Sequence, residues 1–329
     1  MLQIEEGFLN KIELVTKEEL EARLQACLEQ RQMPDYFLYL DDSGVRNWLT
    51  LSNSEEFPVA SRLTGLLMQS LSPIVEHLSG RFDMVSIGVG SGEKERMLLE
   101  ALVHQGTPTY YAVDVSSEMV DEALNTVADI NVEKIGVVAF LEDLAVLRQF
   151  WNPPVLLCLL GNNFCNYDPD ILLETLHAQL QSEDLFLFDC HLLPTQQQAE
   201  DWGREEVERV YRCQLNVRFN IDPLVQRGMN PDDCVFHLEL LPADTSLGSI
   251  YRTTKWLDML KDTTITCGPN NVLLRADDTI SLGFTYKYTC SQVQGYLRRH
   301  GFQEVELFLS PDEDGLLVLV RKQPASRRM

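Results

Sequence analysis

The chain has 329 residues, of which 45% are hydrophobic and 9% aromatic, so it is long enough for one large or two modest domains. Its formal net charge of −23 excludes the basic footprint that nucleic-acid binding requires, and we expect no such partner. The longest apolar run is too short to cross a bilayer and the N-terminus does not read as a secretory leader, which predicts a cytoplasmic protein without membrane contact.

The eight cysteines are scattered without paired spacing, which predicts reduced thiols. Cys234 and His237 have the spacing of half a metal site, but no second half follows them. The apolar residues around them alternate as in a half-buried strand, so we expect no metal.

The first elements of the chain are predicted to be helical. Thr16 and Glu19 form a capping box at the start of a helix that Pro34 ends. The aromatic segment over 35–44 either fills the core or covers a cofactor. A long helix is expected over 58–79, where apolar residues recur at helical spacing.

A buried strand over 82–87 leads into a glycine-rich turn and then into a helix. The turn contains Gly88, Gly90 and Gly92, and Lys94 lies in the first helical turn. Glycines let the backbone approach a ligand, and a helix start offers free N–H groups to a negative group. The spacing is G-x-G-x-G, not that of a dinucleotide site, so a tight turn without a ligand remains an alternative.

The next two strands end in acidic residues. The strand over 109–114 ends in Asp114, followed by Val115, at the place where the ribose of a cofactor would lie. The strand over 135–140 runs into Glu142 and Asp143, which can accept hydrogen bonds from an adenine amino group. A carboxylate that binds a ribose is found in sites for NAD and for S-adenosylmethionine alike. The glycine spacing and the acidic pair favour S-adenosylmethionine.

The fourth strand, over 155–160, opens into a polar loop that contains Gly161, Asn162, Asn166 and Tyr167. Ligands of open parallel sheets bind at the carboxyl ends of the strands, so this loop is expected to face the glycine turn. An amide can orient an amine lone pair, and an aromatic face can stabilise a developing ammonium. Structural Asx turns are the alternative.

The fifth strand, over 185–188, ends in Asp189 and His191, which are candidate acid or base groups at the same edge of the sheet. A structural histidine at a strand end is the alternative interpretation.

The alternation of strands and helices stops after residue 193 and resumes near 289. Strand-like segments over 234–241, 271–275 and 281–288 predict a smaller α+β accessory domain, formed by 1–60 and 194–288. Residues 61–193 and 289–329 are predicted to form a Rossmann-like domain with a terminal antiparallel hairpin, which is the sheet plan of class I methyltransferases.

The sequence resembles the histidine-specific S-adenosylmethionine-dependent methyltransferases from about residue 36 to residue 322. That family trimethylates the α-amino group of histidine in ergothioneine biosynthesis and has fungal relatives that act on tryptophan derivatives. The most specific segments of the resemblance are 40–44, 87–94, 114–116, 161–167, 218–220 and 285–288.

The resemblance implies roles for residues of the cofactor site. Gly88 and Lys94 would contact the methionine end of S-adenosylmethionine, and Asp114 would bind the ribose. Glu142 or Asp143 would bind the adenine, and Tyr39 would cover the cofactor.

On the acceptor side, the resemblance implies that Asn166 holds the amino-acid group of the substrate. Tyr211 would lie opposite the amine, as a proton acceptor or an orienting group. The substrate itself would bind between the two domains.

Two departures bear on the substrate. The histidine enzymes of the family have a glutamate and a serine where this chain has Gly283 and Thr285, and a tyrosine where it has Phe57. The glutamate contacts the imidazole, and loss of a charge-assisted contact typically costs about 1.5–3 kcal/mol.

We therefore expect a monomeric N-methyltransferase that acts on another amino acid or small amine. The alternatives are a true histidine Nα-methyltransferase and a relative that binds the cofactor without transferring a methyl group.

Overall fold

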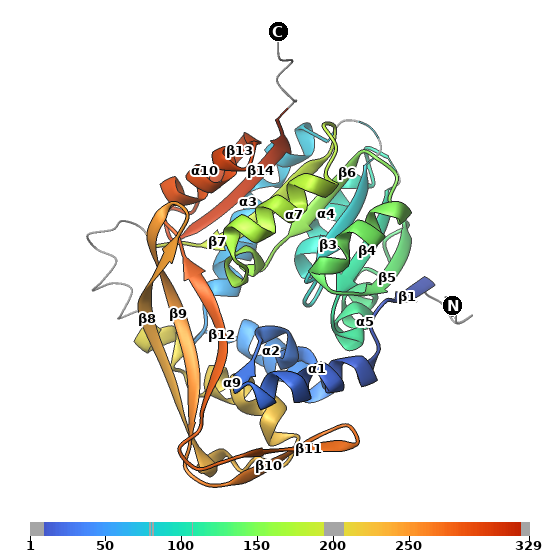
Figure 1. The fold of residues 1–329 in the computed structure, drawn as a ribbon. Coiled ribbons are helices and arrows are strands. Elements are labelled where there is room, and N and C mark those ends of the chain that lie inside the picture. The colour runs from blue at the N-terminus through green and yellow to red at the C-terminus, as the bar shows by residue number, and fades with distance from the viewer. Residues whose placement is uncertain (1–9, 79, 81, 107, 194–206, 324–329) are drawn as a thin grey trace.

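The computed structural model describes residues 10–78, 80, 82–106, 108–193 and 207–323 (Figure 1). Its large sheet has the strand order β1-β5-β4-β3-β6-β7-β14-β13, and β14 alone runs against the other strands. This arrangement confirms the class I methyltransferase plan with its terminal antiparallel hairpin. The strands are β1 (Asn10–Glu13), β3 (Asp83–Ile87), β4 (Thr109–Asp114), β5 (Glu133–Val138), β6 (Val155–Leu159), β7 (Leu185–His191), β13 (Phe302–Leu309) and β14 (Gly315–Lys322).

Helices cover both faces of this sheet, which explains why its central strands are apolar throughout. Successive strand residues point to opposite faces, so Met84 packs in one core with Leu98, and Val85 in the other with Leu172. The helices of the first face are α3 (Val59–Glu76), α4 (Glu93–Leu102) and α5 (Ser117–Thr126); those of the second are α6 (Leu144–Leu147), α7 (Pro169–Gln179) and α10 (Cys290–Arg299).

A smaller sheet has the order β2-β12-β9-β8. In Figure 1 its long strands run from α10 along one side of the molecule to the hairpin of β10 and β11, beside α1, α2 and α9. Its strands are β2 (Gln32–Met33), β8 (Cys234–Thr245), β9 (Gly248–Met259) and β12 (Thr279–Lys287), with β10 (Thr263–Cys267) and β11 (Asn270–Leu274) as a separate hairpin. The neighbouring helices are α1 (Lys17–Glu29), the 3-10 helix η1 (Asp35–Tyr39), α2 (Asp42–Ser52) and α9 (Gln214–Val225).

The N-terminal elements differ in part from the sequence-based expectation. The capping box of Thr16 and Glu19 is present at the start of α1, as predicted. The aromatic segment over 35–44 forms η1 and then the start of α2, whose N-cap is Asp41. The strand β1, which lies within the segment that we assigned to the accessory domain, pairs with β5 of the large sheet. The domain boundaries themselves stay a prediction.

The predicted fifth strand is longer than expected. β7 extends to His191 because β14 pairs with it over its whole length, so Asp189 and His191 lie within a paired strand and not after it. The sequence analysis also missed β9, β10 and α9.

All eight cysteines are unpaired thiols. His237 stacks on Trp256 and binds Asp258 at 3.0 Å, and the described residues contain no group of three His, Cys, Asp or Glu side chains that could hold a metal. Within the same residues, no helix is long and apolar enough to cross a membrane.

Candidate functional site

The glycine turn between β3 and α4 is shaped by close backbone contacts. Gly88 and Gly92 have φ values of +68° and +77°, a region that L side chains rarely adopt. A Cβ at Gly88 would lie 2.5 Å from Nδ2 of Asn163, and one at Gly92 would lie 2.8 Å from Cα of Ala123. Both positions therefore require glycine, because the turn packs closely against the loop after β6 and against α5.

Asp114 ends β4 beside this turn. Its Oδ1 accepts a hydrogen bond from the backbone N–H of Ser116 at 3.0 Å. Burial raises the pKa of Asp114 to about 6, although the backbone N–H groups of Ser116, Val115, Gly90 and Val89 act to lower it. A buried carboxylate at the carboxyl edge of the sheet is what binding of a ribose diol requires.

Lys94 and Asp189 form a buried ion pair at 2.6 Å across the end of the sheet. The other oxygen of Asp189 accepts from the backbone N–H of Asn162 at 2.6 Å. The side-chain oxygen of Asn162 accepts in turn from the backbone N–H of His191 at 2.7 Å. These contacts fasten α4, β7 and the loop after β6 to one another; the ligand-binding and acid–base roles expected of these residues stay predictions.

The loop after β6 contacts both halves of the molecule. It turns at Gly161, with a φ of +86°, and Asn163 then donates to the carbonyl oxygen of Gly88 at 2.9 Å. The sequence analysis assigned no role to Asn163. At the far end of the 3-10 helix η4 (Asn163–Asn166), Oδ1 of Asn166 accepts from Oγ1 of Thr285 at 3.0 Å. Asn166 therefore links the large sheet to β12.

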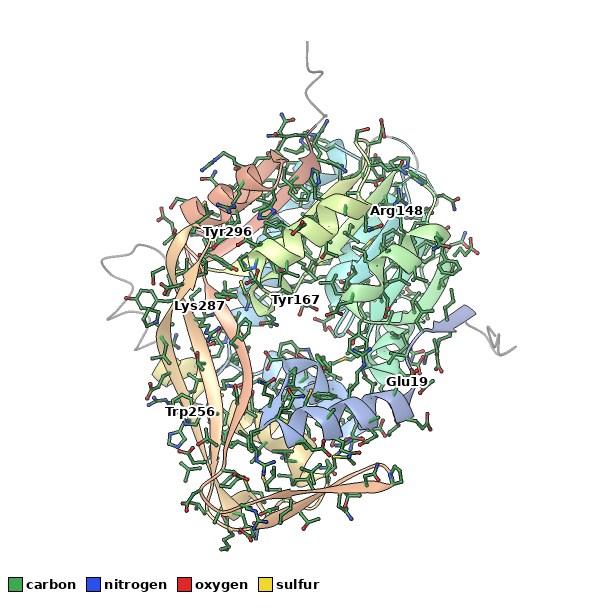
Figure 2. All side chains as sticks on the ribbon, viewed as in Figure 1. Glu19, Arg148, Tyr167, Trp256, Lys287 and Tyr296 are labelled. Carbon is green, nitrogen blue, oxygen red and sulfur yellow. The ribbon has the colours of Figure 1, made fainter. Side chains whose placement is uncertain are left out.

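Two tyrosines lie among carboxylates near this junction. The ring of Tyr39 packs edge-on against Phe219 and Trp48, with centroid distances of 5.4 and 6.0 Å. Burial raises the pKa of Tyr39 and of Tyr167, and the charges of Asp114 and Asp35 raise both further. Figure 2 shows Tyr167 on the side of the large sheet that faces α1 and α2.

The acidic pair after β5 is divided in its contacts. Oδ2 of Asp143 accepts from the backbone N–H of Phe140 at 3.0 Å, which caps the 3-10 helix η2 (Leu141–Asp143). Glu142 is exposed, and its negative charge contributes to the raised pKa of Tyr167. The two acids therefore differ: the carboxylate of Asp143 caps η2, whereas the charge of Glu142 acts on Tyr167.

Tyr211 belongs to a buried cluster with His191 and Lys287, all three at most 7% exposed. Nζ of Lys287 lies 2.5 Å from the Tyr211 hydroxyl and 2.8 Å from Nδ1 of His191. Burial lowers the pKa of His191 well below its usual value, and the charges of Lys287 and Arg62 lower it further. His191 is therefore neutral at pH 7 and accepts from Lys287. Figure 2 shows Lys287 on the strands at the side of the molecule.

Phe57 lies against the same cluster. Its ring meets that of Tyr211 edge-on at a centroid distance of 5.4 Å. The structure therefore brings Phe57 and Tyr211 together, and the substrate-binding role expected of Phe57 stays a prediction.

Gly283 corrects one expectation. The sequence suggested that this part of the site lacks a carboxylate, but a Cβ at Gly283 would lie 2.0 Å from Cγ and Oδ1 of Asp35. Asp35 therefore brings a carboxylate to this position, where its Oδ1 accepts from Nζ of Lys255 at 2.7 Å. The sequence analysis missed Asp35, Lys255 and Lys287 as site residues, because their neighbours in space are far away in the chain.

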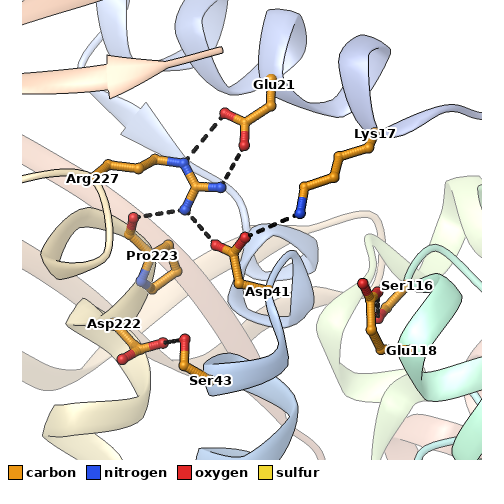
Figure 3. A network of polar contacts seen from close by, with 9 residues as sticks. All are labelled: Lys17, Glu21, Asp41, Ser43, Ser116, Glu118, Asp222, Pro223 and Arg227. Atoms are coloured by element: carbon orange, nitrogen blue, oxygen red, sulfur yellow. Dashed lines mark hydrogen bonds and ion pairs between the residues drawn. The ribbon is translucent and has the colours of Figure 1, made fainter.

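Arg227 fixes the segment that carries Asp35 and Tyr39 (Figure 3). Its guanidinium binds Glu21 of α1 and Asp41, the N-cap of α2, each at 2.6 Å. Lys17 lies 3.6 Å from Asp41, and Ser43 binds Asp222 at 2.6 Å. These contacts join α1, the start of α2 and the end of α9, and η1 packs against α2 and α9.

These residues fit S-adenosylmethionine. The glycine turn at the start of α4 suits its methionine end, and the buried carboxylate of Asp114 suits its ribose. The carboxylates of Asp35, Asp114 and Glu142 around Tyr167 give negative surroundings that suit its sulfonium cation.

Comparisons with known proteins agree with this fit. The model of a family described as histidine-specific methyltransferase, SAM-dependent, matches residues 17–322. The N-methyltransferase fsqC of Aspergillus fumigatus is 24% identical over 301 residues, which cover 87% of this chain and 78% of fsqC. The 4-dimethylallyltryptophan N-methyltransferase easF of the same organism is 22% identical over 308 residues, which cover 84% of this chain and 86% of easF.

Solved structures match more weakly. An S-adenosylmethionine-dependent methyltransferase from Clostridium acetobutylicum aligns with a TM-score of 0.45 and 12% identity, over 86% of this chain and 98% of that one. A likeness of this size supports no argument about the site. The match of the family model across most of the chain shows that it belongs to the histidine-specific, S-adenosylmethionine-dependent methyltransferases and is an enzyme that uses S-adenosylmethionine.

Proposed function

We propose that this enzyme transfers a methyl group to the nitrogen of an amino acid or a related small amine. The observation that carries the proposal is the hydrogen bond between Asn166 and Thr285. Asn166 ends η4, after β6 at the carboxyl edge of the large sheet, where we expect the acceptor to meet the cofactor, and the bond to Thr285 orients its amide there. The two relatives from Aspergillus fumigatus are both named as N-methyltransferases, which supports nitrogen as the acceptor atom.

The residues that would hold the cofactor follow from the geometry. The turn formed by Gly88, Gly90 and Gly92 would face its methionine end, and Asp114 would accept from the ribose hydroxyls. Glu142 suits the adenine better than Asp143, whose carboxylate already caps η2. Tyr39 would cover the cofactor, and Lys94 would have to share its ammonium between the ligand and Asp189.

Bound S-adenosylmethionine supplies a methyl group that is already activated by its sulfonium. The protein must therefore align a neutral amine with that group and exclude water. Oδ1 of Asn166 uses one lone pair to accept a hydrogen bond from Thr285. Its second lone pair can accept a hydrogen bond from an N–H of the substrate amine and so orient that amine. The rings of Tyr39 and Tyr167 can stabilise the positive charge that develops on the nitrogen.

Tyr211 would act at the other side of the acceptor. Lys287 donates to its hydroxyl oxygen, and the positive charge stabilises negative charge on that oxygen. This suits a group that orients the amine or accepts its proton. His191, being neutral and bound by Lys287, would hold the hydroxyl in place and not exchange protons with the substrate.

Histidine remains an acceptor that must be tested, because the Asp35 carboxylate lies beside Gly283. The alternative of a non-catalytic relative predicts cofactor binding without transfer.

The test is methyl transfer from S-adenosylmethionine to histidine, tryptophan, other amino acids and simple amines, with products identified by mass spectrometry. We expect N-methylated product from at least one amine. Asn166→Ala should lower kcat/KM about tenfold or more without weakening S-adenosylhomocysteine binding. Asn271→Ala, in the remote β10–β11 hairpin, is the matched control and should behave as wild type. Cofactor binding without transfer to any amine would contradict the proposal.

A further inference from the structure

We infer that Asp35 is a specificity-determining residue, whose carboxylate binds a nitrogen-bearing group at the far end of the acceptor, away from the nitrogen that is methylated. The inference rests on the proposed function and adds the class of acceptor to it. The acceptor is an amine that also carries a second N–H group, cationic or neutral.

Asp35 lies beside β9 and β12 of the smaller sheet. Thr285 of β12 pairs with Thr253 of β9, so their side chains share one face of the sheet. Lys255 lies two residues farther along β9, on the same face as Thr253, and its ammonium binds Asp35; Gly283, in the irregular stretch of β12 between Ser281 and Phe284, lies against the same carboxylate. Asp35 therefore lies beside the face of β9 that carries Thr253, at a residue roughly 7 Å along that strand.

The opposite direction along β12 leads to the Tyr211 cluster. Lys287 lies two residues beyond Thr285 and binds the Tyr211 hydroxyl. The same strand thus presents three groups in a row: the cluster of Tyr211, the amide of Asn166 and the carboxylate of Asp35. In this proposal the amine is held at Asn166 and the rest of the acceptor extends along the strand toward Asp35.

Gly283 leaves room for the Asp35 carboxylate. A Cβ at this position would lie 2.0–2.2 Å from Cγ and both oxygens of the Asp35 carboxylate. A side chain at 283 and the carboxylate therefore cannot occupy the same place. Gly283 is not among the residues with positive φ, so its backbone does not call for glycine. The need for glycine at this position comes from Asp35.

The Asp35 carboxylate has acceptor sites beyond the one that Lys255 uses. Lys255 binds Oδ1 at 2.7 Å, while a carboxylate offers acceptor sites on both of its oxygens. The Asp35 side chain is 21% exposed, and its charge reaches Tyr39 and Tyr167 in the cofactor region. Asp35 can therefore accept from a further N–H group that enters beside these tyrosines.

The experiment compares acceptors that match in size but differ at the far end. Lysine is paired with norleucine, ornithine with norvaline, and histidine with phenylalanine. Each compound is assayed for methyl transfer and, by calorimetry, for binding to protein loaded with S-adenosylhomocysteine. We expect the wild type to prefer the nitrogen-bearing member of at least one pair by about ten- to a hundredfold.

Two variants address Asp35 by independent routes. Asp35→Asn removes the charge with little change in volume, and Gly283→Ala displaces the carboxylate while keeping Asp35 in the chain. Both should reduce the preference about tenfold or more and leave S-adenosylhomocysteine affinity unchanged. The control is Asp233→Asn, which removes a carboxylate from the exposed ion pair with Lys261 and should preserve the preference.

Each outcome decides the inference. A wild type that shows no preference in any pair, or no binding of any compound, would overturn it, as would an Asp35→Asn variant that keeps the preference. If the protein nevertheless binds S-adenosylhomocysteine and methylates an apolar amine, the inference about Asp35 fails but the proposed N-methylation is supported.

Discussion

The cofactor side and the acceptor side of the site are built in different ways. On the cofactor side, the glycine turn and Asp114 come from two consecutive strands and are shaped by backbone contacts, such as the bond from the N–H of Gly88 to the carbonyl of Val113. On the acceptor side, the contacts join side chains from separate segments: Asn166 with Thr285, Tyr211 with Lys287, and Asp35 with Lys255.

This difference indicates which part of the site can change. Backbone-shaped turns tolerate few substitutions, since a Cβ at Gly88 or Gly92 collides with a neighbour. Side-chain contacts between distant segments can be exchanged one at a time, as with Asp35 beside Gly283. The structure is consistent with a fixed cofactor side and an acceptor side that sets specificity.

Asp114→Ala should have the largest effect on the cofactor side. Asp114 is a buried carboxylate that would accept hydrogen bonds from the ribose, so its loss should lower the affinity for S-adenosylhomocysteine about a hundredfold, as measured by calorimetry. Asp129→Ala, which removes an exposed carboxylate paired with Arg96, is the control. Equal affinity of the Asp114 variant and wild type would rule out the ribose assignment.

Tyr211→Phe should affect the acceptor side alone. Removing the hydroxyl that Lys287 and His191 bind should lower kcat/KM about ten- to a hundredfold, with S-adenosylhomocysteine affinity unchanged. Tyr110→Phe removes a buried hydroxyl in the core beneath the sheet and should keep full activity. If Tyr211→Phe lowered the affinity for S-adenosylhomocysteine as much as kcat/KM, the cofactor side and the acceptor side would not be separable.

Arg227→Met should loosen the support of η1. The change leaves Glu21 and Asp41 without their buried partner, and both carboxylates are only partly exposed. We expect the free energy of unfolding to fall by about 2 kcal/mol in a denaturant titration. Arg96→Met, at an exposed ion pair, should change it by less than about 1 kcal/mol. Equal effects would show that Arg227 does not support η1.

A smaller effect is expected from pH. The pKa of Asp114 is about 6, and the ribose needs the ionised carboxylate, so S-adenosylhomocysteine affinity should fall about tenfold between pH 7 and pH 5. The contribution of this group to stability has the opposite sign. Its pKa is raised in the folded state, so that contribution is present below about pH 4 and is lost as the pH rises through 6. Asp114→Asn should remove both dependences, and a persistent change in affinity would assign the titration to another group.

The sequence was informative where function depends on local order. The strand, the glycine turn and Asp114 lie close together in the chain, and the alternation of strands and helices predicted the large sheet. Asp35 and Lys255 could not be found in this way, because their ion pair joins residues far apart in sequence. β9 could not be found in this way either, because it is stabilised by pairing with β8 and β12 on its two sides.

The most direct test of the account is calorimetry in two steps. S-adenosylhomocysteine is titrated into the purified chain, and histidine and the other amines are then titrated into the loaded protein. The account predicts one cofactor site per chain and an amine that binds when that site is filled. A folded protein that gives no heat with S-adenosylhomocysteine would contradict the account.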